Sequence, residues 1–280
     1  MGASTIQHPP AYGPVLKWAG GKGRLLAQYE PHFPTRFKNY YEPFVGSAAV
    51  FFFLRTQATG RVVLSDVNFE LINFYRALQS DLEGLLEHLA EHRAQHGREH
   101  YYTVRAIDPA SLTDTARAAR MLYLNKTCYN GLYRVNSRGL FNVPMGRYKN
   151  PAILDPERLG VASQALQGVK LEVEPFDRVL RRARKGDLVY FDPPYQPLSA
   201  TSNFTSYTKD SFGEEQQHRL AEVFAKLAQR GVSVMLSNSS APLIRELYRD
   251  FRQIEVQANR FINSKASRRN KIKELLIVAP

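Results

Sequence analysis

Two neighbouring segments near the start of the chain constrain the fold most, because together they predict a parallel strand–helix–strand unit. The first, YYEPFVGSAAVFFFL, holds a short extended run, a turn at Gly46 and Ser47, and a helix-compatible apolar stretch. The second, RVVLSDVN, is a β-branched run that ends on Asp66. Ligands bind at the carboxyl ends of strands in open α/β sheets, so the pair predicts both a fold class and the edge that carries function.

The rest of the chain continues this α/β pattern with one interruption. Residues 80–114 show a charge-rich helical pattern and no strong strand. Strand-like runs return as KLEVEPFD, DLVYFDPPY, GVSVMLSN, FRQIEVQ and KELLIVAP, with a helix expected over 214–230. We therefore predict an α/β, Rossmann-like core over residues 15–78 and 166–280, a mostly helical insertion with a β-hairpin over 79–165, and a flexible lead-in over 1–14.

The positive charge of the chain is unevenly placed. Lys and Arg exceed Asp and Glu by 12, which points to a polyanionic partner. Residues 115–154 hold no acidic residue but contain the basic residues Arg117, Arg120, Lys126, Arg134, Arg138, Arg147 and Lys149. A second basic run comprises Arg260, Lys265, Arg268, Arg269, Lys271 and Lys273.

Cysteine content and hydropathy exclude several other classes. Cys128 is the only cysteine, so we predict no internal disulfide, no cysteine cluster for zinc and no metal site. The start lacks the basic and apolar regions of a signal peptide, and no stretch approaches the roughly 20 apolar residues that span a bilayer. We therefore expect a cytoplasmic protein with no membrane association.

The segment Asp192–Tyr195 carries the most specific chemistry. Two prolines end the preceding apolar run, and because proline lacks an N–H group, the nearby carbonyls face outward as acceptors. A carboxylate, a carbonyl and an aromatic face together would accept hydrogen bonds from an exocyclic amine and stack on its ring. Adenine and cytosine fit this description. Taken alone, the tetrapeptide is equally consistent with a strand-ending turn.

Four motifs in order resemble one enzyme family. They are LKWAGGK (16–22), YEPFVGSAAVFF (41–52), LSDVN (64–68) and VYFDPPY (189–195). The chain resembles the Dam-type adenine-N6 DNA methyltransferases (D12 class, α group), a DNA-associated family of bacteria and phages. The resemblance implies that the core binds S-adenosylmethionine, that the insertion is a target-recognition domain, and that a methyl group passes to N6 of a flipped-out adenine in double-stranded DNA.

The resemblance also implies residue roles at the core. Asp66 would accept from the ribose hydroxyls of the cofactor, and Lys22 would lie near its methionyl carboxylate. From the residues alone, Asp66 could instead be a helix N-cap and Lys22 an exposed lysine. The implied catalytic residues are Asp192, Pro193, Pro194 and Tyr195. The implied cofactor-binding residues are Trp18, Ala19, Gly20, Gly21, Lys22, Phe44, Gly46, Ser47, Asp66 and Asp192.

The stretch from Tyr129 to Pro151 resembles the recognition hairpin of GATC-specific members. Arg134 would be the main guanine reader, because arginine pairs bidentately with guanine. Tyr129 would fill the gap left by the flipped base. The implied DNA-binding residues are Lys17, Tyr129, Asn130, Leu132, Arg134, Arg138, Pro144, Arg147 and Tyr148. A solvated basic face is the alternative for Arg138, Arg147 and Lys149, and the differences from enteric members at Tyr133, Val135 and Ser137 leave GATC favoured but open.

Several alternatives remain at this stage. Tyr207 and Phe212 follow the tetrapeptide and would wall the base pocket or belong to the core. The basic run of residues 260–273 would contact phosphates or form a solvated loop. A cytosine-N4 methyltransferase and a catalytically inactive DNA-binding relative are the alternative functions. The enzyme would act alone or beside a cognate restriction endonuclease of the same site.

Overall fold

The computed structural model describes residues 13–198, 212–259 and 271–280 of the chain. The chain divides into two compact units. The sheet unit comprises Arg24–Val45, Gln57–Asn68 and Val169–Pro280, and the helical unit comprises Met1–Gly23, Gly46–Thr56 and Phe69–Gly168. Compactness does not show which residues bind DNA, so the target-recognition domain stays a prediction.

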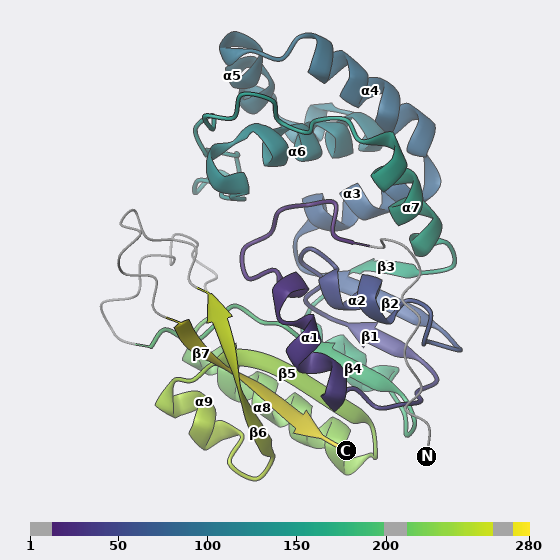
Figure 1. Ribbon diagram of the computed structural model, residues 1–280, viewed down its shortest axis with the longest axis vertical. Helices are drawn as coiled ribbons and strands as arrows, with labels where there is room; N and C mark the ends of the chain where they lie inside the picture. Colours follow the sequence, from purple (N-terminus) through teal and green to yellow (C-terminus); the bar gives the residue numbers. More distant parts are fainter. Residues whose placement is uncertain (1–12, 199–211, 260–270) are drawn as a thin grey trace. The chain divides into compact units, whose positions relative to one another are not determined.

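The sheet unit contains a seven-stranded sheet in the order β3-β2-β1-β4-β5-β7-β6 (Figure 1). The β7 strand runs antiparallel to β5 and β6, whereas the other pairings are parallel. This topology confirms the predicted α/β fold class. The strands are β1 Tyr40–Glu42, β2 Val62–Asp66, β3 Lys170–Val173, β4 Leu188–Phe191, β5 Ser233–Ser239, β6 Arg252–Asn259 and β7 Lys271–Ala279.

The strand order reverses between β1 and β4. The chain extends from β1 outward to β2 and β3, then returns to β4 on the other side of β1, where Tyr41 is paired with Val189. Such a reversal leaves a crevice at the carboxyl ends of the two strands, where ligands bind in sheets of this type. The Asp192–Tyr195 segment begins directly after β4 and therefore starts at this reversal.

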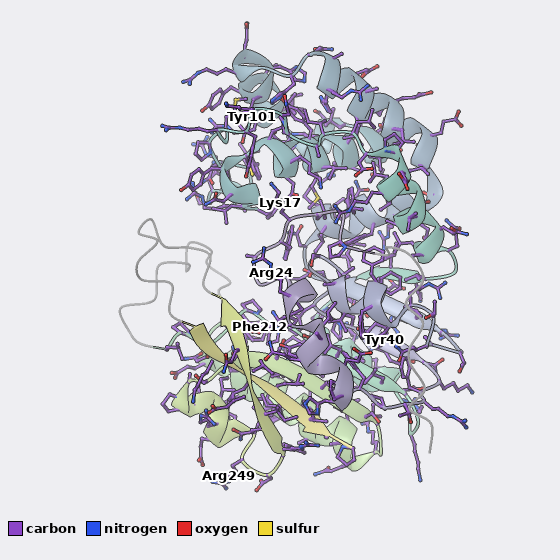
Figure 2. The ribbon with its side chains drawn as sticks, in the orientation of Figure 1. Lys17, Arg24, Tyr40, Tyr101, Phe212 and Arg249 are labelled. Carbon is purple, nitrogen blue, oxygen red and sulfur yellow. The ribbon has the colours of Figure 1, made fainter. Side chains whose placement is uncertain are left out.

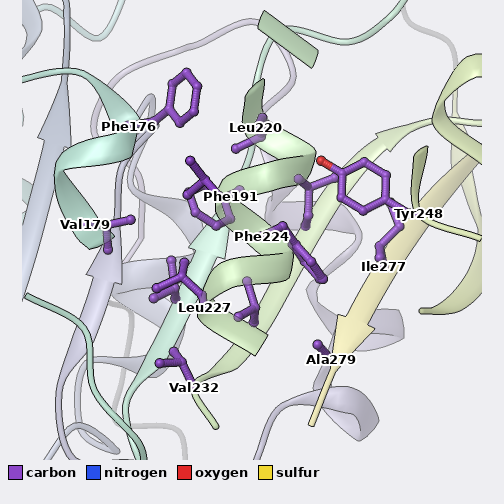
Figure 3. Packing of buried hydrophobic residues seen from close by; sticks show 14 of the residues in the cluster. Phe176, Val179, Phe191, Leu220, Phe224, Leu227, Val232, Tyr248, Ile277 and Ala279 are labelled. Atoms are coloured by element: carbon purple, nitrogen blue, oxygen red, sulfur yellow. The ribbon is translucent and has the colours of Figure 1, made fainter. Parts of the chain in front are cut away.

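Helix α8 (Glu214–Gln229) supplies much of the core of the sheet unit. Its apolar residues recur at helical spacing, and Leu220, Phe224 and Leu227 are fully buried against the strands (Figure 3). Burying each such side chain stabilises the fold by roughly 1.5–3 kcal/mol. The shorter elements of this unit are α1 Leu26–Tyr29, α9 Pro242–Leu247 and the 3-10 turns Glu30–His32 and Phe176–Arg181; the turn Lys22–Arg24 spans the boundary of the two units.

The helical unit is organised around α6 (Asp114–Thr127), which packs against α3, α4 and α5. Thr113 caps α6 by accepting from the Ala116 N–H, and Asp81 caps α4 by accepting from Gly84. The other elements are α2 Ala49–Leu54, α3 Phe69–Ser80, α4 Leu82–Ala94, α5 Arg98–Ala106, α7 Pro156–Leu166 and the 3-10 turns Pro109–Ser111 and Tyr129–Gly131.

The predicted β-hairpin is present without regular strands. Two isolated antiparallel bridges, Cys128 with Met145 and Val135 with Phe141, hold it together. The side chain of Asn136 organises its turn. Neither bridge extends into a ladder, so the segment is a hairpin loop rather than a pair of strands.

Over the described ranges, no helix has both the length and the apolar character needed to cross a bilayer.

Candidate functional site

The Asp192 carboxylate is fixed by the strand next to it. The Ser237 hydroxyl on β5 donates to Asp192 Oδ1 at 2.8 Å, and the Tyr190 hydroxyl lies 2.9 Å from Ser237 Oγ. Tyr190 and Ser237 are fully buried. The position of the carboxylate is therefore set by a buried hydrogen-bonded chain across β4 and β5.

The residues that follow Asp192 are held in the same way. Gln217 on α8 donates to the Pro194 carbonyl at 2.9 Å, and Asn238 Nδ2 donates to Gln217 Oε1 at 3.1 Å. Asn238 Oδ1 also accepts from the Gln196 N–H, and the Ser239 hydroxyl donates to the Gln196 carbonyl. Both amide side chains are fully buried. Because two prolines leave this segment poor in backbone donors, side chains of the sheet unit fix its course.

The Tyr195 hydroxyl donates to Glu274 Oε2 on β7 at 2.7 Å. Burial, followed by the nearby Asp192 carboxylate, raises the pKa of Tyr195 well above its usual value, so the phenol stays protonated and acts as a donor. The Tyr29 hydroxyl is buried beside Ser237 and Tyr195 and forms no hydrogen bond of standard geometry within the described part of the chain. The hydroxyls of Tyr29, Tyr190 and Ser237 thus lie close to the Asp192–Tyr195 segment.

Asp66 ends β2, as the sequence predicts. Its Oδ1 accepts from the Asn68 N–H at 3.0 Å in the turn that precedes α3, so Asp66 lies three residues before the first helical residue, Phe69, rather than at the cap position. Val67 beside it is 71% exposed, and Val173, paired with Asp66 across β2 and β3, is 39% exposed. Exposed apolar side chains at strand ends would suit the flat face of a ligand, and sequence reasoning did not select them.

Phe44 belongs to an aromatic cluster of the sheet unit. Its ring stacks on Phe176 with centroids 5.5 Å apart, and Phe212 meets it edge-on at the same distance. Phe212 also packs against the hydrophobic core, which favours the core alternative for this residue. Tyr207, the other candidate for the pocket wall, lies outside the described residues.

In the helical unit, the glycine loop of residues 18–22 is tightly folded. Lys22 is 3% exposed and its Nζ donates to the Gly20 carbonyl, so the alternative of an exposed lysine is wrong. Gly46 has φ +45, and a Cβ there would lie 3.0 Å from Trp18 Cδ1. A side chain at Gly46 is therefore excluded where the turn at Gly46 and Ser47 meets the glycine loop. Ala19 and Gly21 are exposed, and Ser47 is buried.

Lys17 is clamped by a residue that sequence reasoning missed. The Lys17 N–H donates to Asn125 Oδ1 at 2.9 Å, and Asn125 Nδ2 donates to the carbonyls of Lys17 and Gly131. Lys17, labelled in Figure 2, places its Nζ 4.4 Å from the centre of the Tyr148 ring. The 2%-exposed Asn125 amide thus joins two predicted DNA-binding segments. Its sequence signal is only a polar residue that directly follows the apolar run Met121–Leu124.

The hairpin presents its predicted base-contacting residues outward. Tyr129 is 53% exposed, and Asn130 adopts the left-handed conformation with φ +55. Arg134 and Pro144 are exposed, and the Arg134 Nε donates to Asn142 Oδ1 at 2.7 Å, which orients the guanidinium. Leu132, between Asn130 and Arg134 in the sequence, is partly buried, and Arg138, Arg147 and Lys149 are exposed.

Tyr133 packs against aromatic rings of the same unit. Its ring stacks on Trp18 with centroids 5.3 Å apart and an interplanar angle of 26°, and its centroid lies 5.9 Å from that of the Phe141 ring. Tyr133 therefore packs the hairpin against the glycine loop.

The basic residues on α6 are internal. Arg117 pairs with Glu70, and the 4%-exposed Arg120 donates to the carbonyls of Val104 and Arg105. Burial lowers the pKa of Lys126 to about 8. In the sheet unit, Lys273 of the second basic run pairs with Glu255 at 2.8 Å. From composition alone, these basic residues would be expected to bind a polyanion, but their contacts within the protein indicate structural roles.

Comparison with known proteins places the chain in a family. Residues 18–262 match the model of the D12 class N6 adenine-specific DNA methyltransferases. The chain is 43% identical over 270 residues to the type II methyltransferase M1.LlaDCHI of Lactococcus lactis subsp. cremoris, with 94% of each chain covered. It is 43% identical over 283 residues to the type II methyltransferase M.MjaIII of Methanocaldococcus jannaschii, covering 95% of this chain and 98% of the relative. It is 40% identical over 263 residues to the DNA adenine methylase of Escherichia coli, covering 93% of each.

These matches span the glycine loop, the hairpin and the Asp192–Tyr195 segment. The predicted activity, transfer of a methyl group from S-adenosylmethionine to adenine N6 of DNA, is confirmed at the level of the family, and the cytosine-N4 alternative is set aside. The chain belongs to the D12 class of N6 adenine-specific DNA methyltransferases.

Proposed function

We propose that this enzyme methylates N6 of the adenine in duplex GATC sites after turning that adenine out of the base stack. The observation that carries the proposal is the anchoring of the Asp192–Tyr195 segment by the buried side chains of Ser237 on β5 and Gln217 on α8 and by Glu274 on β7. A strand-ending turn has no need for such support. Geometry held this firmly is what a reaction that depends on orientation requires.

The chemistry follows from the groups in this segment. Asp192 and the Pro193 carbonyl hold the two N6 hydrogens while Tyr195 stacks on the base, so that the nitrogen lone pair faces the sulfonium methyl. The new N–C bond forms as the S–C bond breaks, and N6 then loses a proton. S-adenosylmethionine supplies the electrophilic methyl group. Positioning two reactants can contribute roughly 7–11 kcal/mol, which makes Asp192 an orienting group rather than a nucleophile.

The cofactor roles are proposed residue by residue. The close approach of Gly46 to Trp18 and the buried Lys22 support the glycine loop as a holder of the methionyl end. The position of Asp66 at the end of β2 supports its role with the ribose hydroxyls. Both sets of groups suit the amino-acid and nucleoside parts of S-adenosylmethionine.

The hairpin supports recognition of GATC. Arg134, oriented by Asn142, would read a guanine, and the exposed Tyr129 would occupy the space of the flipped base. Extruding a base costs a few kcal/mol, which the contacts of exposed Arg138, Arg147 and Lys149 with phosphates would offset.

A direct assay tests the proposal. The protein is incubated with labelled S-adenosylmethionine and matched duplexes with and without GATC, which are then digested to nucleosides. We expect N6-methyladenine in the GATC duplex only. No N6-methyladenine in any duplex would overturn the activity, and equal labelling of both would overturn the site. Asp192→Ala should abolish transfer and leave duplex binding largely intact.

The relatives named type II methyltransferases favour a role in protecting DNA beside a cognate endonuclease. Such a role requires that fully modified DNA resists an endonuclease of the same site. Digestion of DNA from cells that express the enzyme measures this resistance. A neighbouring endonuclease gene would support the paired role, and its absence would support solitary action in the cytoplasm.

A further inference from the structure

The bond between Tyr195 and Glu274 joins the motif to a strand far along the chain. We propose that Glu274 is a positioning residue that acts through Tyr195, fixing the ring and raising its electron density against the adenine as that adenine gains positive charge. The inference rests on the proposed stacking of Tyr195 on the target base. It adds a residue from outside the motif to the methyl-transfer site.

The bond between Tyr195 and Glu274 fixes the orientation of the ring. A tyrosine ring turns about two side-chain bonds, and a hydrogen bond at its far end removes that freedom. The bond of 2.7 Å to Glu274 has a carboxylate as its acceptor, and such bonds are roughly twice as strong as those between neutral groups. Glu274 itself lies in register opposite Ser239 on β5 and Val256 on β6, so its backbone is paired on both sides.

The bond to Glu274 also has an electrostatic effect on the ring. While the N–C bond forms, the amine nitrogen gives up its lone pair and the base carries positive charge until a proton leaves. The face of an aromatic ring attracts positive charge. A phenol that donates to a carboxylate transfers electron density into its ring, which strengthens this attraction. Because the charge exists only during the reaction, the contact should accelerate transfer without tightening the binding of DNA.

The protonation state fits this role. Burial raises the pKa of Tyr195 well above its usual value, so the hydroxyl retains its proton and remains the donor. The nearby carboxylate of Asp192 acts in the same direction. Tyr195 can therefore donate to Glu274 throughout the neutral range.

The experiment is a double-mutant cycle under single-turnover conditions on the GATC duplex. The variants are Glu274→Gln, Glu274→Ala, Tyr195→Phe and the combination of the last two. We expect Glu274→Ala to lower the methyl-transfer rate constant roughly three- to tenfold, with the duplex Kd changed less than about twofold. Glu274→Gln should be intermediate, because its amide oxygen still accepts from the phenol but carries no charge.

Coupling separates this role from mere stability. In the Tyr195→Phe enzyme, Glu274→Ala should cause no further loss of rate, because the bond is already absent. Glu255→Gln is the matched control, since it removes a carboxylate of the adjacent strand that pairs with Arg245 and Lys273 at the surface, and it should retain the wild-type rate.

The outcomes are distinct. Additive losses in the cycle, or a wild-type rate in Glu274→Ala, would overturn the inference while leaving the proposed function intact. Failure of the wild-type protein to form N6-methyladenine would overturn both. If Glu274→Ala does not fold, Glu274→Gln and Tyr195→Phe form the same cycle with the same criterion.

Discussion

The acid-free stretch consists of two segments, residues 115–127 with three basic residues and residues 128–154 with four, and these basic side chains have opposite surroundings. In residues 115–127, which form most of α6, Arg117 pairs with Glu70 and Arg120 is buried. In residues 128–154, the basic side chains lie on the exposed hairpin and the loop after it. A run of positive charge in the sequence is therefore not by itself a surface for DNA.

Secondary structure explains the difference. A helix that packs against three others has few outward positions, so long basic side chains on it reach back to carbonyls and carboxylates of its neighbours. On the hairpin loop, which has only two isolated bridges, the basic side chains are exposed. The comparison predicts that basic residues of α6 govern stability and those of the hairpin govern binding.

The largest expected effect is at Arg120. Arg120→Ala removes the buried guanidinium that donates to the carbonyls of Val104 and Arg105 and should lower the free energy of unfolding by about 2–4 kcal/mol. Urea unfolding measures this change. Arg138→Ala, on the hairpin, is the control and should stay within about 0.5 kcal/mol. Equal stability of the two variants would remove the distinction between α6 and the hairpin.

Arg134→Ala should act on recognition instead. We expect a loss of about 1–3 kcal/mol of discrimination at one base pair of the site, with stability unchanged. Competition binding with duplexes altered at each position measures it. Asn142→Ala should give a smaller loss at the same position, because Asn142 orients the guanidinium. A uniform loss across all duplexes would make Arg134 a phosphate contact.

Lys126 tests the comparison through pH. Burial lowers the pKa of Lys126 from 10.5 to about 8. Below about pH 8 the side chain is protonated in both the folded and the unfolded state, so the buried charge destabilises the folded state by its full amount. Between pH 8 and pH 10.5 Lys126 is deprotonated in the folded state but still protonated in the unfolded state, and the destabilisation decreases to zero over this range. Lys126→Met should therefore raise the free energy of unfolding by about 1–2 kcal/mol at pH 7, and the gain should vanish as the pH approaches 10.5.

Thermal and urea unfolding at several pH values would show this trend for Lys126→Met. A variant that is less stable than wild type at pH 7 would contradict the assignment of an unfavourable buried charge. A large loss of duplex affinity in the same variant would place Lys126 with the hairpin residues.

The smallest effect is expected at the exposed phosphate candidates. Arg138→Ala should weaken binding to every duplex by a similar factor and reduce the slope of log affinity against log salt by about 1. Affinities at several salt concentrations measure the slope. An unchanged slope would mean that this side chain is a solvated charge that does not meet the backbone of DNA.

Local patterns were sufficient to predict much of the molecule. The β-branched run before Asp66 and the apolar run before Asp192 become β2 and β4, because each is short, apolar and ended by turn residues. The helix expected over 214–230 forms from Glu214 to Gln229. These features depend on neighbours in the chain, which a sequence displays directly.

The supports of the site depend on distant partners. Gln196 is 42 residues from Asn238, and Tyr195 is 79 residues from Glu274. Serine, asparagine and glutamate at the ends of strands are common, and only the register of β4, β5 and β7 brings them to the motif. The inward roles of Arg120 and Lys126 likewise follow from the packing of α6, which residue composition does not contain.

The stack of Trp18 on Tyr133 has a practical consequence. Trp18 is the only tryptophan of the chain, and Gly46 and Tyr133 both lie against its ring. The intrinsic fluorescence of tryptophan in this protein therefore originates from one indole, at the meeting point of the glycine loop and the hairpin. Ligand binding at the glycine loop or at the hairpin can therefore be followed by the fluorescence emission of Trp18, without an added dye.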